Sequence, residues 1–255
     1  HSGEHMGIHD RDYSRTSRQP ASFERFRMWS VTGWLIVINV AVFILDAFLY
    51  RAGIVGQVPT GRAIAGPDGT VSVIVNQTSP LEAIGHFSAG TAIYGLQIWR
   101  FLTFQFLHAN LQHLFFNMLG LYFFGQMIES FLGRQRFLIF YLVCGAAGAL
   151  VYLGLWKLNV LVGSPWVPLV GASAGIFGIL AAASRVAPRA TVMMAFPPMP
   201  IELRTWAMLL LGIAALTIIF AGPNAGGEAA HLGGAIAGYL GIRAAAPGPR
   251  MRLTH

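Results

Sequence analysis

The chain has 255 residues, of which 55% are hydrophobic and only 11% are charged, and its formal net charge is +7. Soluble globular domains carry about 25% charged residues, so the composition excludes an ordinary soluble enzyme and favours a helical membrane protein. The positive charge does not indicate a nucleic-acid partner, because the arginines flank the apolar runs, as topology signals of membrane proteins do.

The two ends of the chain are polar. Residues 1–28 predict a cytoplasmic N-terminal tail, and the first six of them, HSGEHM, are typical of a remnant of expression. No short apolar region precedes the first long apolar run, which argues against a cleaved signal peptide. Residues 247–255 predict a cytoplasmic C-terminal tail, which leaves residues 29–246 as one membrane domain.

The first apolar segment, from Trp29 to Tyr50, is long enough to cross a bilayer as a helix. Residues 51–110 follow as a long first loop, whose Gly, Pro and Asn content does not fit a spanning helix. Within this loop, TVSVIV at residues 70–75 predicts a short strand, which we expect to pair in a hairpin with residues 62–65. The aromatic stretch at residues 92–106 is typical of the lipid headgroup layer.

Five further apolar segments follow the loop. They run from Leu111 to Phe131, from Gln135 to Trp156, from Val170 to Ala183, from Thr205 to Ala221 and from Ala229 to Ala246. With the first segment they predict an all-α membrane protein that forms a bundle of six transmembrane helices. The segment from Val170 to Ala183 is too short to cross comfortably, so we expect it to begin part-way into the membrane.

The distribution of Lys and Arg predicts the orientation of the bundle. Six spans place both termini on one side, and that side then holds most of the 17 Lys and Arg residues. The positive-inside rule therefore predicts that both termini lie in the cytoplasm. The long first loop and the front of the short fourth segment then face outward.

The short fourth segment carries the motif GASAG, in which Ser173 stands between Gly171 and Gly175. A Gly-x-Ser-x-Gly pattern alone is weak evidence, because a chain with 30 glycines produces it readily by chance. Its meaning in α/β-hydrolases requires a strand before the serine, and no strand–helix alternation occurs here. A hydroxyl part-way into a membrane instead indicates a wet site at which the serine is used.

His231 stands at the head of the sixth segment in AHLGGAIAGYL, and an ionisable residue in a spanning helix indicates a functional site. Gly234 and Gly238 follow on the same helix face, and glycines let two helix backbones approach closely. We therefore expect the imidazole to lie within hydrogen-bond reach of Ser173, as a serine nucleophile requires. The structural alternative is a histidine satisfied only by its packing partners.

A third polar cluster consists of His108, His113 and Asn117 in HANLQHLFFNM. His113 and Asn117 are spaced i, i+4 and therefore point in the same direction on a helix. The HExxH spacing is absent and no carboxylate accompanies the histidines, so we predict no metal and no cofactor. Donors that converge on one point fit an oxyanion hole, where negative charge develops on a carbonyl oxygen.

Several other polar residues have structural interpretations. Asn39 and Asp46 are expected to form hydrogen bonds inside the bundle. Glu129 lies near the cytoplasmic end of the second segment, on the wrong side for catalysis, and is expected to form a structural hydrogen bond. Trp99 and Arg100 are interpreted as interfacial anchors.

Together these motifs resemble those of the rhomboid family of intramembrane serine proteases. The resemblance covers residues 29–246 and rests on GASAG with Ser173, AHLGG with His231, the run with His108, His113 and Asn117, the Trp99–Arg100 pair, and Glu129. It implies a rhomboid-like bundle whose short central helix carries the nucleophile, with a membrane-associated first loop. It also implies a multi-pass protein of the bacterial inner membrane.

The resemblance further implies roles for single residues. Ser173 is then the nucleophile and His231 the general base of an endopeptidase that cleaves transmembrane segments of protein substrates through an acyl-enzyme. His113, Asn117 and the backbone N–H of Ser173 form the oxyanion hole. Supporting positions are His108, Gly171 and Phe177, the last of which matches an aromatic residue that packs on the catalytic histidine.

Three points remain open from the sequence. No Asp or Glu is near enough in sequence to be an obvious third catalytic residue, so a pair of Ser173 and His231 is the simplest arrangement. Residues 56–88 form an apparent insertion in the first loop relative to the smallest bacterial relatives. The alternatives to a protease are a non-catalytic relative that binds membrane clients and a polar-cavity transporter, although no internal symmetry supports the transporter.

Overall fold

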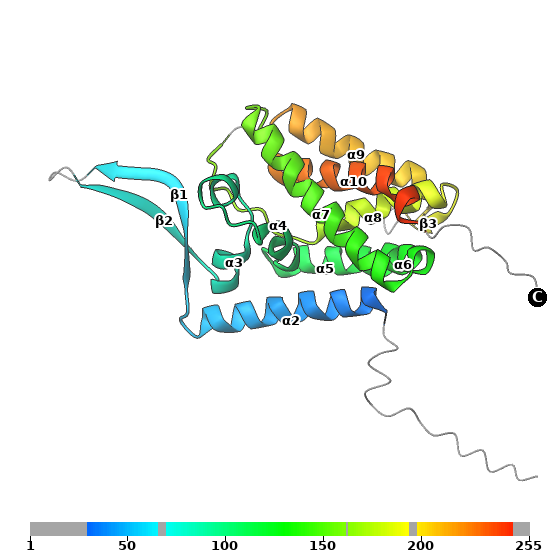
Figure 1. Ribbon diagram of the computed structural model, residues 1–255, viewed down its shortest axis with the longest axis horizontal. Coiled ribbons are helices and arrows are strands. Elements are labelled where there is room, and N and C mark those ends of the chain that lie inside the picture. Colours follow the sequence, from blue (N-terminus) through cyan, green and yellow to red (C-terminus); the bar gives the residue numbers. More distant parts are fainter. Residues whose placement is uncertain (1–29, 66–69, 162, 194–197, 247–255) are drawn as a thin grey trace, which may run out of the picture.

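The computed structural model describes residues 30–65, 70–161, 163–193 and 198–246, and Figure 1 shows their arrangement. The two predicted tails, residues 1–28 and 247–255, lie outside the described residues, so both stay predictions. The described part of the chain is mostly helical, as the apolar composition predicts.

The long helices lie close to the predicted segments. They are α2 (Val31–Arg51), α7 (Arg134–Lys157), α8 (Ser173–Val186), α9 (Leu203–Ile219) and α10 (Ala225–Ala245). The second predicted segment is divided into α5 (Leu111–Gly120), the π-helical turn η3 (Leu121–Gly125) and α6 (Gln126–Leu132). Among the described helices, only α2 and α7 are both long and apolar enough to cross a membrane, so six spans stay a prediction.

Two small antiparallel sheets accompany the helices, so the all-α class describes the bundle and not the whole chain. Strands β1 (Gly56–Ala65) and β2 (Val71–Thr78) form the predicted hairpin of the first loop, and both are longer than the sequence predicts. The hairpin projects away from the helices (Figure 1). Strands β3 (Thr191–Met193) and β4 (Pro200–Glu202) form a second hairpin before α9, which the sequence did not predict.

The rest of the first loop consists of short helical turns. They are α3 (Pro80–Gly85), the π-helical turn η1 (Gly90–Tyr94), α4 (Arg100–Thr103) and the 3-10 turn η2 (Phe104–Phe106). Arg100 is only 5% exposed and donates hydrogen bonds to the backbone oxygens of His86 and Ala83 at 2.6 and 2.9 Å. The predicted role of Arg100 as an interfacial anchor is therefore wrong, because its side chain ties α4 to the end of α3. Trp99 is 52% exposed, and its role as an interfacial anchor stays a prediction.

Helix α2 lies along one side of the molecule (Figure 1), and carboxylates hold it near both ends. Glu129 of α6 is buried and accepts hydrogen bonds from the hydroxyl and the N–H of Thr32 at 2.7 and 2.9 Å. These bonds satisfy a donor in the first helical turn that has no partner within the helix. Asp46 accepts a hydrogen bond from the hydroxyl of Ser79 at 2.5 Å, and Asn39 donates to its own helix backbone. The structural interpretation of Glu129 and Asn39 is therefore confirmed, whereas Asp46 bonds to the first loop and not inside the bundle.

Helix α8 is buried between α7 and α10, and glycines permit its contact with α10. A Cβ atom at Gly234 would collide with the backbone oxygen of Ala174, and one at Gly238 would collide with that of Gly178. The predicted close approach of these two helices at their glycines is therefore confirmed. This contact fixes the spacing between the segment that carries Ser173 and the segment that carries His231.

Candidate active site

Ser173 is the first residue of α8, so the candidate nucleophile lies at the N-terminal end of a short helix, as the sequence predicts. Gly171, just before it, has a φ of +130°, a backbone conformation that favours glycine. A Cβ atom at this position would lie 2.7 Å from Cε1 of His113 and 3.5 Å from Oγ of Ser173. Gly171 therefore provides both the turn into α8 and the space between the serine and His113.

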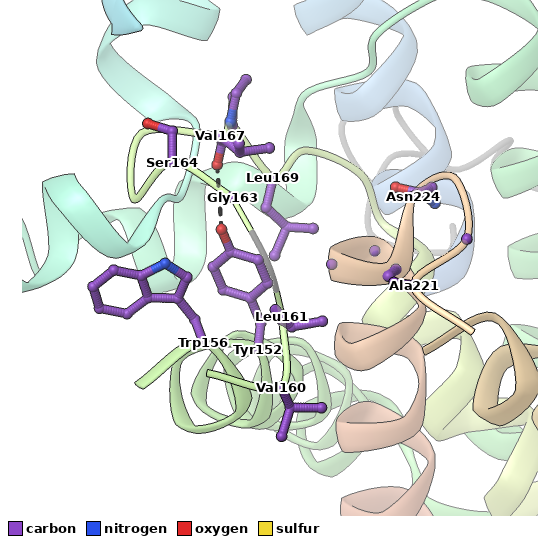
Figure 2. Close-up of a pocket in the computed structure, with 15 residues that line it drawn as sticks. Tyr152, Trp156, Val160, Leu161, Gly163, Ser164, Val167, Leu169, Ala221 and Asn224 are labelled. Carbon is purple, nitrogen blue, oxygen red and sulfur yellow. Dashed lines mark hydrogen bonds between the residues drawn. The ribbon is translucent and has the colours of Figure 1, made fainter. Parts of the chain in front are cut away.

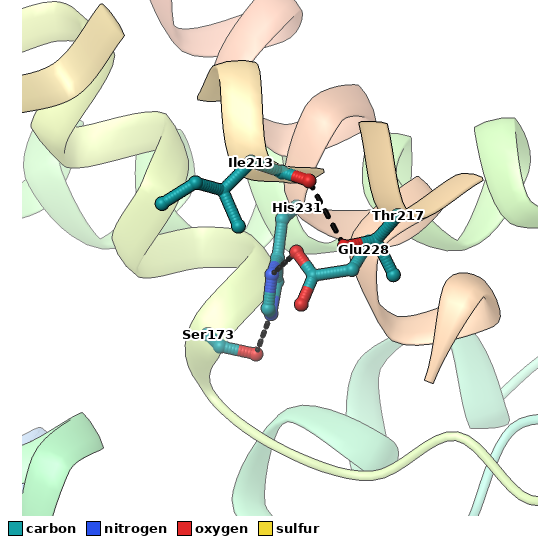
Figure 3. A network of polar contacts seen from close by, with 5 residues as sticks. All are labelled: Ser173, Ile213, Thr217, Glu228 and His231. Carbon is teal, nitrogen blue, oxygen red and sulfur yellow. Dashed lines mark hydrogen bonds and ion pairs between the residues drawn. The ribbon is translucent and has the colours of Figure 1, made fainter. Parts of the chain in front are cut away.

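Ser173 and His231 are in direct contact. The Oγ atom of Ser173 lies 2.8 Å from Nε2 of His231, and Figure 3 shows the two side chains facing each other from α8 and α10. The imidazole stacks on Phe177 of α8, with a distance of 4.2 Å between ring centroids and an interplanar angle of 3°. Because Phe177 is one helical turn after Ser173, the helix that carries the hydroxyl also orients the imidazole.

A carboxylate also contacts the histidine, so the expectation that none accompanies it is wrong. The Oε2 atom of Glu228 lies 3.0 Å from Nδ1 of His231 (Figure 3). Helix α10 begins at Ala225, before the predicted start at Ala229, and therefore includes both residues. Side chains spaced i, i+3 lie on the same face of a helix, and this spacing is the sequence signal that could have identified Glu228.

Of the side chains predicted to form the oxyanion hole, His113 lies beside Ser173. His113 is adjacent to the serine across Gly171, and its ring centroid is 5.2 Å from that of His108. Asn117 lies one turn further along α5, and its buried Nδ2 atom has no hydrogen-bond partner among the described residues. A buried donor without a partner costs about 1–3 kcal/mol, so this amide is available to an oxygen that binds at the site.

His108 makes the folding stability of the protein depend on pH. Burial, together with the positive charge of the nearby His113, lowers the pKa of His108 to about 3. The unfolded chain binds this proton at about pH 6.5, so folding stability is fully present above that value and decreases as the pH falls toward 3. We expect the thermal unfolding temperature to decrease between about pH 7 and about pH 4, and to decrease less in His108→Asn. Equal acid sensitivity of the two proteins in calorimetry would contradict this expectation.

A cavity of about 260 Å³ lies beside the start of α10 (Figure 2). Its walls include Tyr152, whose hydroxyl donates to the backbone oxygen of Val167 at 3.4 Å, and residues 224–227 of the turn before Glu228. The side chains of His231 and Glu228 are 15% and 21% exposed. Neither side chain is therefore fully buried by the protein. Within the described residues, no group of three or more His, Cys, Asp or Glu side chains could hold a metal ion.

Comparisons with known proteins identify relatives of this chain. The family model described as the rhomboid domain matches residues 95–245. The chain is 32% identical over 165 residues to Rhomboid protease AarA of Providencia stuartii. The matched residues are 59% of this chain and 58% of that protein. It is 29% identical over 171 residues to RHOMBOID-like protein 1 of Arabidopsis thaliana. That match includes 64% of this chain and 41% of the relative.

A third relative is described as inactive. Over 104 residues, 41% of this chain and 27% of the relative, the chain is 33% identical to Inactive RHOMBOID-like protein 8 of Arabidopsis thaliana. The chain spans less than two thirds of the length of each of these three relatives. The relatives of this chain therefore include both a named protease and a protein named as inactive.

Proposed function

Since the chain belongs to the rhomboid family, whose members are integral membrane proteins, we propose that it is an intramembrane serine endopeptidase. The proposed substrates are the transmembrane segments of other membrane proteins. The observation that carries this proposal is the 2.8 Å contact between the hydroxyl of Ser173 and the imidazole of His231. A serine hydroxyl beside a base is the arrangement that nucleophilic catalysis requires.

In the proposed mechanism, Nε2 of His231 takes the hydroxyl proton as Oγ of Ser173 attacks a peptide carbonyl carbon. The carbonyl oxygen becomes negative and accepts hydrogen bonds from His113, Asn117 and the backbone N–H of Ser173. That N–H belongs to the first turn of α8, where backbone donors have no partner within the helix and the helix dipole is positive. His231 then protonates the leaving amine, and water hydrolyses the acyl-enzyme.

The proposed substrates must unwind locally before they can be cleaved, because a carbonyl inside a helix is already hydrogen-bonded to the backbone. We therefore expect small residues at the cleaved bond, with Gly or Pro close by, since these residues weaken helices. Membrane lipid is the expected surrounding of enzyme and substrate.

The proposed topology has six spans with both termini in the cytoplasm, in a bacterial inner membrane. The spans are α2, the run from α5 to α6, then α7, α8, α9 and α10. Arg134 at the start of α7 and Arg185 at the end of α8 support a common cytoplasmic side. The first loop, residues 51–110, then lies on the outer side together with Ser173 and the start of α8.

A covalent probe tests the proposed nucleophile. A fluorophosphonate, which reacts with activated serines, should label the purified protein, and peptide mass spectrometry should locate the label on Ser173. Ser184 of the same helix is a matched control, because it is buried and its hydroxyl donates to the backbone oxygen of Ala181 at 2.8 Å. Ser184→Ala should therefore be labelled as fast as the wild type.

The same experiment separates the alternatives. A polar-cavity transporter would give no label on Ser173. A non-catalytic relative would capture membrane clients but would neither react with the probe nor cleave a reporter with a transmembrane segment. Absence of both labelling and cleavage by the folded protein would contradict the proposed function.

A further inference from the structure

We propose that Glu228 is a positioning residue of the active site, which fixes the tautomer and the orientation of His231 and balances the charge that the imidazole acquires. The proposed set is then Ser173, His231 and Glu228 in place of a serine–histidine pair. This inference rests on the proposed function, because it has a catalytic consequence only if His231 acts as the general base.

The first argument concerns the two ring nitrogens of His231. Its Nε2 atom lies 2.8 Å from Oγ of Ser173, and its Nδ1 atom lies 3.0 Å from Oε2 of Glu228. A neutral imidazole carries one proton, and Nε2 must lack it to accept the serine hydroxyl proton. The proton is then on Nδ1, and the Nδ1–H group donates a hydrogen bond to the carboxylate of Glu228. Glu228 therefore selects the tautomer that can act as a base.

The second argument concerns the orientation of the ring. Phe177 lies flat against one face of the imidazole, at 4.2 Å between centroids, which restricts tilting but permits rotation within the ring plane. Glu228 and Ser173 contact opposite edges of the ring, as Figure 3 shows, and restrict that rotation. Loss of the Glu228 contact leaves Nδ1 without this restraint, so Nε2 points toward the serine for a smaller fraction of the time.

The third argument concerns charge. When His231 takes the proton from the serine it becomes a cation, and a carboxylate 3.0 Å away stabilises it. Among the described residues, His113 beside Ser173 and His108 next to His113 are the other titratable side chains close to the site, and neither can supply a negative charge. Because His231 and Glu228 are 15% and 21% exposed, water screens part of this attraction. The expected contribution is therefore about 10- to 100-fold in rate, which is at or below the low end of general-base effects.

A purely structural role for Glu228 makes a different prediction. The residue lies in the first turn of α10, where a negative charge stabilises the helix end. Such a role would affect the thermal unfolding temperature and leave the catalytic constant of the folded protein unchanged. A positioning role instead lowers kcat, because it acts on proton transfer, and leaves KM and folding nearly unchanged.

The test compares the wild type with Glu228→Gln in cleavage of a transmembrane reporter and in the rate of fluorophosphonate labelling. Gln keeps the size of the side chain and an oxygen that can accept from Nδ1–H, but it carries no charge. We expect kcat and the labelling rate to decrease about 10- to 100-fold, with KM within about twofold. Glu228→Asp keeps the charge and should recover part of the rate. Glu202→Gln, which removes a carboxylate at the start of α9, is the matched control and should match the wild type.

The outcomes distinguish this inference from the proposed function. An active wild type with an equally active Glu228→Gln variant overturns the charge-balancing role of Glu228, and an equally active Glu228→Ala variant, which also lacks the acceptor, overturns its role altogether; both results leave the protease intact. A variant that changes only the unfolding temperature does the same, and assigns the carboxylate to the helix end. In a His231→Ala background, Glu228→Gln should cause no further loss, and an additional loss by the same factor overturns the inference. A folded wild type without any activity overturns both proposals.

Discussion

Replacement of Ser173 by alanine is expected to reduce reporter cleavage to background, a loss of about 10⁴-fold or more in kcat/KM. In the proposed mechanism the hydroxyl oxygen of Ser173 forms the acyl-enzyme, and no other described hydroxyl contacts His231. Alanine fits the first turn of a helix, and the imidazole keeps its stacking contact with Phe177, so the variant should fold normally. The measurement is reporter cleavage by purified protein in liposomes, beside its thermal unfolding.

The Ser173→Ala variant also separates catalysis from binding. It should capture a transmembrane substrate as well as the wild type does, because the removed atom contributes to the reaction and little to the contact surface. Residual cleavage above about 1% of the wild-type rate in a folded variant would mean that the nucleophile lies elsewhere. Ser184→Ala, on the same helix, is the control that should retain the full rate.

The second large effect is expected from Gly238→Val. A Cβ atom at Gly238 would overlap the carbonyl group of Gly178, and a backbone group cannot move aside as a flexible side chain can. Overpacking typically costs about 1–3 kcal/mol, so the unfolding temperature should decrease by roughly 5–10 °C. Since α8 and α10 must separate, Ser173 and His231 should also move apart, and the rate of fluorophosphonate labelling should decrease with stability.

Gly212→Val on α9 provides the matched control for this experiment. No atom lies within 4 Å of a Cβ atom built at Gly212, so the same substitution adds a side chain in open space. It should leave both the unfolding temperature and the labelling rate close to the wild type. Equal stability of the Gly212→Val and Gly238→Val variants would show that the glycine contact does not hold the two helices at their spacing.

The long helices, the first-loop hairpin and the contact between Ser173 and His231 could all be predicted from the sequence. Apolar runs predict the helices, and a short β-branched run predicts the hairpin. Glycines that recur on one face of each of two helices predict the close contact that brings Ser173 and His231 together. The structural role of Glu129 could also be predicted, because its place along the segment separates it from Ser173. These features depend on residue types and spacing, which do not require knowledge of the tertiary contacts.

Glu228 was missed because the residues before it resemble a loop. Gly226 and Gly227 are poor helix formers, so the sequence pattern favours a helix that begins later. In the fold, α10 nevertheless begins at Ala225, and a Cβ atom at Gly226 would lie 2.9 Å from the ring of Tyr152. Packing against α7 therefore overrides the weak local preference of this turn.

Arg100 was misinterpreted for a related reason. An arginine beside a tryptophan in a membrane-associated loop usually indicates the interface, and local sequence supplies no sign of burial. Its partners are the backbone oxygens of His86 and Ala83, which come together only when α3 and α4 have packed. Contacts between a side chain and distant backbone atoms leave no periodic pattern in the sequence, so they could not be predicted from it.

The left-handed turn at Gly171 has a consequence for the development of inhibitors. Every other amino acid at this position would bring its Cβ atom against the ring of His113 and would also strain the backbone. A compound whose selectivity depends on the surface of Gly171 would therefore leave few routes to resistance, since a substitution that blocks the compound would also distort the proposed active site.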